Sequence, residues 1–253
     1  MKIAIAGGTG TVGRHVVRAA QEHGHTVVVL SRKEGVDVLT ARGVDEALDG
    51  ADALVDVLNT TTLATKKAVA FFTTVTRNLL DAETRVGVAH HVGLSIVGID
   101  GIDTSYYAGK LAQERLVSDS AVPHTIARTA QFHEFAEQVA TQATFGPMTV
   151  VPRTLSRPVA ARDVGAHLVH VAETAPAGRA PDLIGPEDET LAAMVRRMYR
   201  HDGTNRRVLD VRLPGAYGTG LASGSLRGGV SPTRTTDTTF DAWLHTSDHR
   251  NRP

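Results

Sequence analysis

Apolar residues in the first half of the chain follow two alternating patterns. Short continuous runs of β-branched and aliphatic residues predict strands at residues 3–6, 27–30, 36–38, 53–57, 88–94 and 124–127. Apolar positions spaced by three and four predict helices at residues 11–23, 64–84 and 104–118. Continuous strand runs are typical of a sheet covered on both faces. Together these patterns predict an α/β fold, a Rossmann-type doubly wound parallel sheet.

The second half of the chain has a less regular pattern. Helical spacing recurs at residues 131–143, 161–173 and 190–201. Residues 214–237 are rich in Gly, Ser, Thr and Pro, which predicts a long loop. Its central part, 215–230, is either a mobile lid over a pocket or an unstructured connection. Phe240 and Trp243 predict a short final helix, followed by a frayed polar tail at residues 245–253.

The composition fits one folded domain. The 253 residues are 42% apolar and include no cysteine, which excludes a disulfide scaffold, a thiolate zinc site and a cysteine nucleophile. Lys and Arg together number 27, as do Asp and Glu, and this zero net charge argues against a nucleic-acid partner. Because no repeat or linker interrupts the chain, we expect a single domain over residues 1–253, in which about 131–253 contributes most of a small C-terminal substrate lobe.

No membrane span is expected, because no apolar run approaches the about 20 residues that a span needs. We therefore predict a cytoplasmic protein with a small-molecule substrate and without a membrane or nucleic-acid partner. The helix predicted at residues 64–84 fits both a dimer face and an ordinary helix on the sheet, so the pattern fits a monomer and a homodimer equally.

A glycine-rich segment follows the first predicted strand and opens the first predicted helix. It reads Gly7-Gly8-Thr9-Gly10-Thr11-Val12-Gly13. Glycines at this spacing allow a tight turn, a close approach of the backbone to a pyrophosphate, and contact between helix and strand. The helix N-terminus then offers N–H groups and a partial positive charge to phosphate. Because the context is strand, turn and helix, the segment predicts a dinucleotide-binding loop.

The end of the second predicted strand indicates which dinucleotide is bound. Sites for NAD usually place a carboxylate there to bind the ribose hydroxyls. This chain instead has Ser31, Arg32 and Lys33, and the first acid is Glu34. A guanidinium fork, an ammonium and a hydroxyl would suit a 2′-phosphate. The segment therefore predicts NADPH/NADP+ as the cofactor.

Tyr106 and Lys110 are spaced by four on a predicted helix and so share one face. A nearby ammonium favours the phenolate and lowers the pKa of a tyrosine. Such a pair can exchange a proton with a carbonyl oxygen while hydride moves, and Ser95, at the end of the fifth predicted strand, could hold the same oxygen. Tyr107 is adjacent, so the sequence leaves open which tyrosine faces the cofactor.

Histidines and carboxylates beyond residue 131 give weaker signals. His133, with Glu134, follows the sixth predicted strand and could shuttle a proton, although a hydrogen-bonded structural histidine is the commoner case. Asp163, His167 and His170 could share one helix face. Because no further group of ligands supports a metal, we expect them to be structural and expect no metal site.

Taken together, these motifs resemble the short-chain dehydrogenase/reductase superfamily, and more narrowly its atypical, NmrA-like NAD(P)H-binding branch. The resemblance covers nearly the full length and rests on residues 7–13, 31–32, 36–38, 47–50, 71–73, 78–80, 94–98, 106–114, 128–135, 158–164, 239–240 and 243–244. The glycine motif is specific to the superfamily, and the stretch from Gln131 to Phe135 is specific to the branch.

The resemblance also implies positions for the cofactor and the reaction. It implies cofactor contacts at Asp37, Val38, Leu58, Asn59, Thr60, Leu94, Lys110, Ala130, Gln131 and Phe132, in addition to the glycine loop and Ser31–Lys33. Asp37 would meet the adenine, Asn59 the adenosine ribose and Gln131 the nicotinamide. Ser95, Tyr106 and Lys110 match the Ser–Tyr–Lys triad of the superfamily. Members of this branch often lack a working tyrosine, so the resemblance implies cofactor binding more strongly than acid–base catalysis.

Three functions fit these residues. The leading hypothesis is an NADPH-dependent oxidoreductase that reduces a carbonyl, a quinone or a similar small electrophile. The second is a non-redox enzyme of the same superfamily, of the epimerase or dehydratase type, which keeps the cofactor without net turnover of it. The third is an NmrA-like regulatory protein that senses the dinucleotide. The Tyr106–Lys110 pair favours an enzyme, because a sensor needs neither residue.

Overall fold

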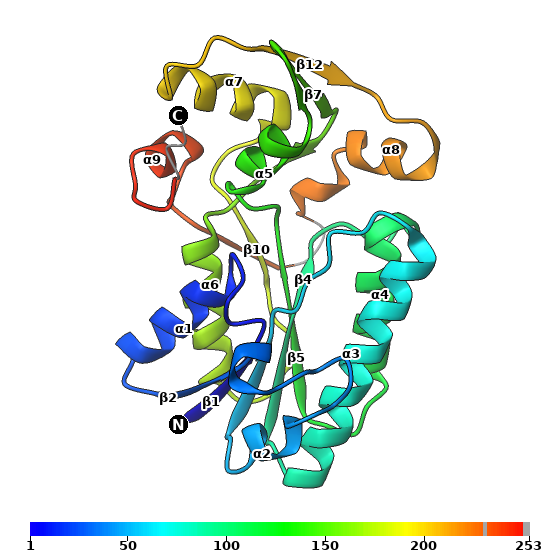
Figure 1. The fold of residues 1–253 in the computed structure, drawn as a ribbon, viewed down its shortest axis with the longest axis vertical. Helices are drawn as coiled ribbons and strands as arrows, with labels where there is room; N and C mark the ends of the chain where they lie inside the picture. The colour runs from blue at the N-terminus through cyan, green and yellow to red at the C-terminus, as the bar shows by residue number, and fades with distance from the viewer. Residues whose placement is uncertain (230–231, 250–253) are drawn as a thin grey trace. The chain divides into compact units, whose positions relative to one another are not determined.

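Strands and helices alternate along the first half of the chain in the computed structural model, which describes residues 1–229 and 232–249 (Figure 1). The chain forms two compact units that are interleaved in sequence. Unit 1 comprises Met1–Ser95, Asp103–Arg128 and Val164–Pro181, and unit 2 comprises Ile96–Ile102, Thr129–Asp163 and Asp182–Pro253. A single domain with a substrate lobe beginning near residue 131 stays a prediction.

Five parallel strands form the main sheet of unit 1, in the order β2-β1-β3-β4-β5. They are β1 (Lys2–Ala6), β2 (Thr26–Leu30), β3 (Ala53–Asp56), β4 (His90–Ile96) and β5 (His124–Thr129), and the short β9 (Gly178–Arg179) pairs with β5. Strand β1 lies between β2 and β3 and places Ile5 opposite Val29 on one side and Val55 on the other. All residues of β3 are buried, as their continuous apolar run predicts.

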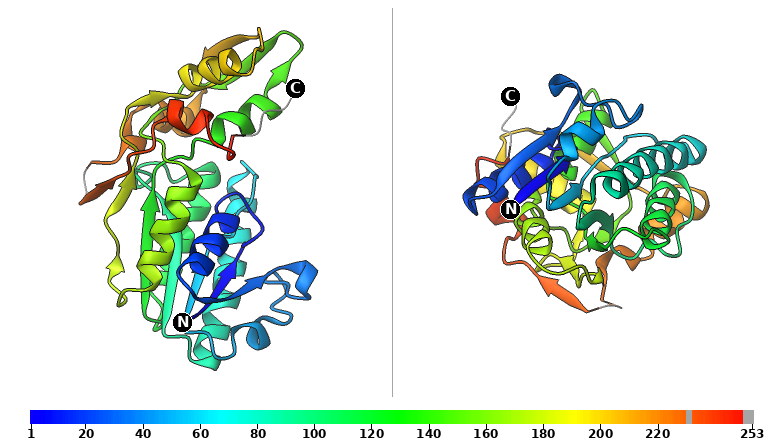
Figure 2. Two further views of the ribbon diagram at one scale, coloured as in Figure 1. Left: turned by 90° about the vertical axis from the view of Figure 1, so that its left-hand side faces the viewer. Right: turned by 90° about the horizontal axis from the view of Figure 1, so that it is seen from below.

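Helices cover both faces of this sheet. Helices α1 (Gly13–Glu22) and α6 (Ala161–Ala172) lie on one face, and α3 (Thr65–Val86) and α4 (Ser105–Ser118) lie on the other (Figures 1 and 2). The short η1 (Arg32–Glu34) and α2 (Val44–Leu48) follow β2. These elements confirm the predicted Rossmann-type fold. Within the described residues, no helix has both the length and the apolar character that crossing a membrane requires.

The strand predicted at residues 36–38 is wrong. Both valines of this segment are buried, but Asp37 makes only an isolated antiparallel bridge, to Arg42. Gly35 (φ +81°) and Gly43 (φ +71°) turn the backbone on either side, so the segment folds back as a loop. Its alternating valines therefore indicated burial and not a strand.

Unit 2 consists of short helices and strands. In chain order they are α5 (Phe135–Gln142), β6 (Thr144–Phe145), β7 (Met148–Pro152), β8 (Leu155–Ser156), β10 (Asp182–Ile184), β11 (Glu189–Thr190), α7 (Leu191–His201), β12 (Arg207–Val211), α8 (Gly215–Ala222), the 3-10 turn η2 (Ser225–Arg227), β13 (Thr233–Thr235) and α9 (Phe240–Leu244). Strands β12, β7 and β6 form one sheet, and β11 pairs with β8. Strand β10 pairs with β13 and, through Leu183, with Thr129. Buried residues of α5, α7 and α9 form the core.

The long loop predicted at residues 214–237 is also wrong, as is its interpretation as an unstructured connection. The structure forms α8, η2 and β13 there, while residues 230–231 lie outside the described residues. A Cβ on Gly218 would lie 1.9 Å from the backbone oxygen of Leu213, and one on Gly220 would lie 2.6 Å from Ile102 Cδ1. Glycine here permits close packing of a helix. In the sequence alone, such a glycine cannot be distinguished from a glycine in a loop.

The final helix α9 confirms the prediction from Phe240 and Trp243. The prediction of a frayed tail, however, is wrong at His249. This residue is 7% exposed and hydrogen-bonded to two carboxylates. Residues 250–253 of the predicted tail lie outside the described residues.

Candidate functional site

The glycine loop lies at the carboxyl end of β1 in unit 1. Gly7 has φ +87°, and a Cβ there would lie 2.9 Å from the oxygen of Val57. A Cβ on Gly13 would lie 2.1 Å from the oxygen of Gly7, so the start of α1 can approach the turn only as glycine. The Gly10 amide donates to Gly7 O over 2.9 Å and closes the turn. The loop therefore presents backbone where the sequence predicts a pyrophosphate.

The N-terminus of α1 is suited to an anion. Val12 occupies the N-cap and has no polar side chain, and the first turn contains no acidic residue. Thr9, Gly10 and Thr11 are exposed before it. The Arg14 and His15 amides donate to Gly10 O and Val12 O, and the positive end of the helix dipole has no competing carboxylate in the first turn.

The residues predicted to bind a 2′-phosphate follow β2. Ser31 is half-buried, and Arg32 and Lys33 are exposed in η1. Asp37 lies beyond them, where its Oδ1 accepts the amide of Leu39 over 3.0 Å. The structure thus keeps the two basic side chains accessible at the end of this strand.

Tyr106 and Asn59 lie together, although they are distant in sequence. The Tyr106 hydroxyl donates to Asn59 Oδ1 over 2.7 Å, and the same oxygen accepts the amide of Thr60 over 2.8 Å. Tyr107 is 6% exposed, and its ring meets the Tyr106 ring edge-on at 5.9 Å. A predicted catalytic tyrosine therefore contacts a predicted ribose-binding segment.

Lys110 is held in a buried polar network. Its Nζ donates to Leu94 O over 2.5 Å and to the side-chain oxygen of Gln113. Gln113 in turn donates from Nε2 to Asp56 Oδ2 over 2.7 Å, and Asp56 Oδ1 accepts the amide of Leu58 over 2.9 Å. The network ties the ends of β3 and β4 to α4. It brings together the predicted residues Lys110, Leu94 and Leu58.

Burial lowers the pKa of Lys110 to about 8, although the carboxylates of Asp56 and Glu114 oppose that shift. The ammonium lies 4.8 Å from the centroid of the Phe72 ring. At pH 7 the lysine is therefore largely protonated, and its cation is satisfied by oxygen atoms and an aromatic face.

Ser95, at the end of β4, has a different environment. It is 2% exposed, and its Oγ has no hydrogen-bond partner among the described residues. A buried hydroxyl without a partner is uncommon in native structures and indicates a missing ligand or water. This hydroxyl is next in sequence to Leu94, whose carbonyl binds Lys110.

Sequence reasoning missed Asp56 and Gln113. Gln113 lies three residues after Lys110 on one helix, so its position on the same face could have been predicted. Asp56 ends an otherwise apolar buried strand, and an acid in such a run is itself a signal of a partner.

The segment predicted to flank the nicotinamide belongs to unit 2. Ala130 is buried and donates its amide to Leu183 O over 2.8 Å. Gln131 accepts the amide of Val159 over 2.9 Å, and Phe132 forms a parallel bridge with the same residue. Both side chains are half-buried.

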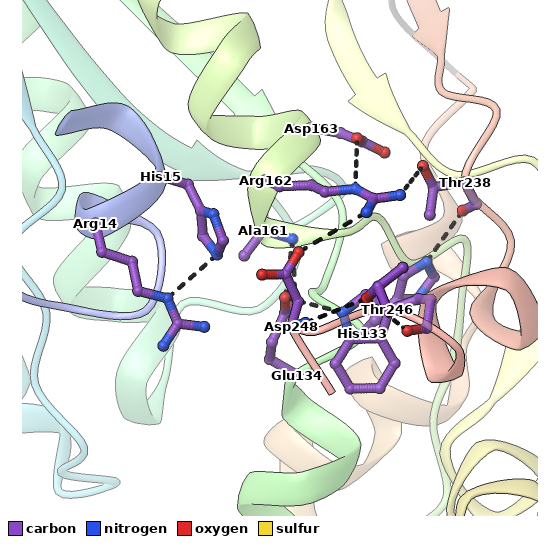
Figure 3. A network of polar contacts seen from close by, with 11 residues as sticks. Arg14, His15, His133, Glu134, Ala161, Arg162, Asp163, Thr238, Thr246 and Asp248 are labelled. Atoms are coloured by element: carbon purple, nitrogen blue, oxygen red, sulfur yellow. Dashed lines mark hydrogen bonds and ion pairs between the residues drawn. The ribbon is translucent and has the colours of Figure 1, made fainter. Parts of the chain in front are cut away.

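His133 and Glu134 are buried in a network of unit 2 (Figure 3). His133 Nε2 lies 3.1 Å from Thr238 O, and burial lowers the histidine's pKa to about 4. Glu134 accepts the Ala161 amide at 3.2 Å and Trp243 Nε1 at 3.2 Å. Burial raises the pKa of Glu134 to about 7. The two residues hold α9 to the start of α6, which is a structural task.

The three residues considered for a metal are not among the groups of closely spaced ligand atoms in the described part of the chain. Asp163 pairs with Arg162 at 3.6 Å in the same network. His167 is 7% exposed, and His170 is exposed near the end of α6.

Solved structures with this fold share little sequence with the chain. The NADPH-dependent quinone oxidoreductase of Escherichia coli, complexed with NADPH, has a TM-score of 0.71 at 17% identity, covering 96% of this chain and 98% of that chain. A nucleoside-diphosphate-sugar epimerase from Staphylococcus aureus gives 0.70 at 16%, covering 97% and 100%. Triphenylmethane reductase of Citrobacter sp., complexed with NADP(H), gives 0.66 at 14%, covering 89% and 91%. At these identities, the matches show the fold alone.

The sequence comparisons identify the family. No curated protein matches the chain. The model of the NmrA-like family matches residues 1–176, which is more than half of the sequence and includes the glycine loop, Tyr106 and Lys110. The chain therefore belongs to the NmrA-like family, and its fold is of the Rossmann type.

Proposed function

We propose that the protein is an NADPH-dependent oxidoreductase that reduces a carbonyl, a quinone or a similar small electrophile. The observation that carries the proposal is the steric requirement for glycine at Gly7 and Gly13, directly before an α1 N-terminus free of acidic residues. The NADPH-bound quinone oxidoreductase and the NADP(H)-bound triphenylmethane reductase of the same fold support it.

The residues present fit a phosphorylated dinucleotide. The glycine loop would hold the pyrophosphate, and the exposed Arg32 and Lys33 would hold the 2′-phosphate. The buried hydroxyl of Ser95 has a donor and two acceptor lone pairs to offer to a substrate oxygen. Asn59, whose Oδ1 already binds Tyr106, would adjoin the ribose.

When bound, NADPH supplies a hydride, which carries the two electrons of the reduction. The substrate oxygen then needs a proton, which the Tyr106 hydroxyl or water would donate. Lys110 keeps its ammonium on Leu94 O and so holds a positive charge at the end of β4. In that position it would stabilise negative charge and would not serve as a free base, because Leu94 O and Gln113 already hold its ammonium.

One observation favours a second candidate, a dinucleotide sensor without turnover. Leu94 O and Gln113 accept hydrogen bonds from Lys110, and Asp56 accepts one from Gln113. These contacts give Lys110 a structural role that needs no catalysis. If Lys110 only holds the strand ends together, cofactor binding remains while acid–base chemistry is lost.

Thermal unfolding with NADPH, NADP+, NADH and NAD+ tests cofactor choice. Ligand at about 100 times its dissociation constant stabilises the folded state by ~2.7 kcal/mol. We expect a rise in Tm with the phosphorylated pair. Arg32→Ala should weaken NADPH about tenfold or more and NADH little, because only the 2′-phosphate contact is lost. Arg77→Ala, an exposed arginine on α3, is the matched control. Equal losses for both nucleotides would contradict the assignment.

Turnover separates the enzyme from the sensor. Oxidation of NADPH is followed with a panel of quinones and aldehydes, in the wild type and in Tyr106→Phe. Steady consumption supports the reductase, and its loss in the variant identifies the tyrosine as proton donor. A protein that binds NADPH but turns over no member of the panel would favour the sensor, and product formation without net NADPH loss would favour the non-redox enzyme.

A further inference from the structure

A cluster of histidines and carboxylates in unit 2 has no part in the proposed reaction. His201 and Asp202 end α7, Glu137 lies on α5, and His249 follows α9 in the chain (Figure 1). Asp202 Oδ1 lies 3.1 Å from His201 Nδ1 and 2.8 Å from His249 Nε2. The ligand atoms of these three residues all lie within 4.8 Å of one another.

The His249 ring faces a carboxylate on each side. Its Nδ1 lies 2.6 Å from Glu137 Oε1, and its Nε2 lies 2.8 Å from Asp202 Oδ1. A neutral imidazole carries one N–H, so it can donate to only one of these two oxygens. The other oxygen then faces a nitrogen lone pair, unless a second proton or a cation lies between them. The side chain of His249 is 2% exposed, so little water reaches the ring to screen that contact.

A second histidine cluster, in unit 1, lacks this feature. His23 Nδ1 and His25 Nε2 both lie 2.8 Å from one oxygen of Glu173. Two neutral rings with one N–H each satisfy that arrangement, and His23 and Glu173 are exposed. Proton counting thus singles out the cluster around His249.

We propose that His201 Nδ1, Asp202 Oδ1 and His249 Nε2 bind a zinc ion. Zinc takes imidazole nitrogen at about 2.0–2.1 Å and carboxylate oxygen at about 2.0–2.2 Å, so the three atoms need only small side-chain rotations to share one ion. The set contains two nitrogens, which suits zinc better than calcium or magnesium. Water fills the fourth position.

Glu137 lies against the ring nitrogen of His249 that does not bind the ion. A metal-binding histidine usually donates its other N–H to a carboxylate, which fixes the tautomer and orients the ring. Glu137 Oε1 occupies that place at His249 Nδ1. With zinc on Nε2 and a proton on Nδ1, every charge in the cluster has a partner. The ion joins the segment after α9 to the end of α7 and keeps one coordination position for water.

The test uses the full-length protein, freed of metal by a chelator and titrated with zinc chloride at pH 7.5. We expect one tightly bound zinc per chain by elemental analysis and a higher Tm on zinc addition. Asp202→Asn removes the anionic ligand and should abolish tight binding. Glu137→Gln should weaken binding about 10–100-fold, as loss of an outer carboxylate does.

Two variants serve as controls. Asp241→Asn removes an exposed carboxylate on α9 and should leave zinc binding unchanged. Glu173→Gln disables the cluster in unit 1 and should also leave it unchanged. Should Asp202→Asn fail to fold, the zinc-dependent Tm of the wild type and of Glu137→Gln still decides. Wild-type protein that binds no zinc would overturn the proposal, and so would zinc lost in Glu173→Gln alone.

Discussion

Each unit buries an ionisable side chain, but the two are surrounded differently. Lys110 in unit 1 is 3% exposed, contacts a carbonyl and an amide oxygen, and is attracted by the carboxylates of Asp56 and Glu114. Glu134 in unit 2 is 8% exposed and accepts only from neutral donors, an amide and the Trp243 indole. Lys110 consequently keeps its charge at pH 7, whereas Glu134, with a pKa of about 7, is half-protonated there.

The difference between these two sites teaches that a buried charge can be compensated, as at Lys110, or that a buried acid can stay close to its neutral form, as at Glu134. Arg128 and Glu114 illustrate the first case with two hydrogen bonds of 2.8 and 2.6 Å. His133 illustrates the second, since burial lowers its pKa to about 4 and keeps the ring neutral. Stability of the two units should therefore respond to different perturbations.

The largest effect is expected from breaking a compensated pair in unit 1. Arg128→Met leaves the half-buried Glu114 without its arginine partner and should lower the free energy of unfolding by up to about 3–5 kcal/mol, the range for breaking a buried pair. Denaturant unfolding measures it. Arg85→Met removes an exposed arginine paired with Asp45, and should change stability little. Equal losses from both variants would mean that burial does not distinguish the pairs.

The next effect concerns pH and unit 2. Glu134 has a folded pKa of about 7, above its ordinary 4.5, so it destabilises the fold progressively as pH rises from about 4.5 to 7. His133 has a folded pKa of about 4, below its ordinary 6.5, so it destabilises the fold as pH falls from 6.5 to 4. Each contributes roughly 3 kcal/mol over its window, and the two slopes oppose each other between pH 4.5 and 6.5.

Single substitutions should separate the two opposing pH dependences of the free energy of unfolding. Glu134→Gln removes the pH dependence that Glu134 causes and leaves that of His133. We therefore expect the stability of this variant to fall as pH falls from 6.5 to 4. His133→Gln should show the opposite, with stability rising as pH falls from 7 to 4.5. Urea unfolding at steps of pH measures both, with the wild type nearly flat between 4.5 and 6.5. If stability changed with pH in the same direction in both variants, the two residues would not have opposing effects.

The smallest effect is expected at a helix cap. Thr239 accepts the Ala242 amide over 3.1 Å at the start of α9, and Thr239→Ala should cost about 1 kcal/mol. Because α9 carries Trp243, loosening it should admit water to Glu134 and reduce the pH slope of the His133→Gln background. Thr190 caps α7 in the same way, and Thr190→Ala should cost a similar amount without changing that slope.

Much of unit 1 could be predicted from sequence because its signals are local. Buried parallel strands need continuous apolar runs, and α3 repeats apolar positions over 22 residues. The glycine loop could be placed because its strand and helix flank it directly. The segment at residues 36–38 failed because two glycines decide the path of its backbone, and glycine conformation is not encoded by hydrophobic pattern.

The rest of the fold and of the candidate site depends on contacts between residues that are distant in sequence. Strand β7 pairs with β12, and Val150 faces Leu209 across a separation that no periodicity reveals. In the candidate site, Tyr106 and Lys110 could be selected from their spacing, but their partners Asn59 and Asp56 come from another part of unit 1. Sequence therefore indicates chemistry-bearing residues and leaves their hydrogen-bond partners to the fold.

The interleaving of the two units affects how the protein is made. The chain leaves unit 1 after residues 95 and 128 and finishes it only with Pro181. Strand β5 is complete at Thr129, while β9, which pairs with it, ends at Arg179. At a synthesis rate of about 5–20 residues per second, the edge of β5 waits roughly 3–10 s for its neighbour on the ribosome. An open strand edge is a template for aggregation, so the edge of β5 is open to wrong pairing for that interval.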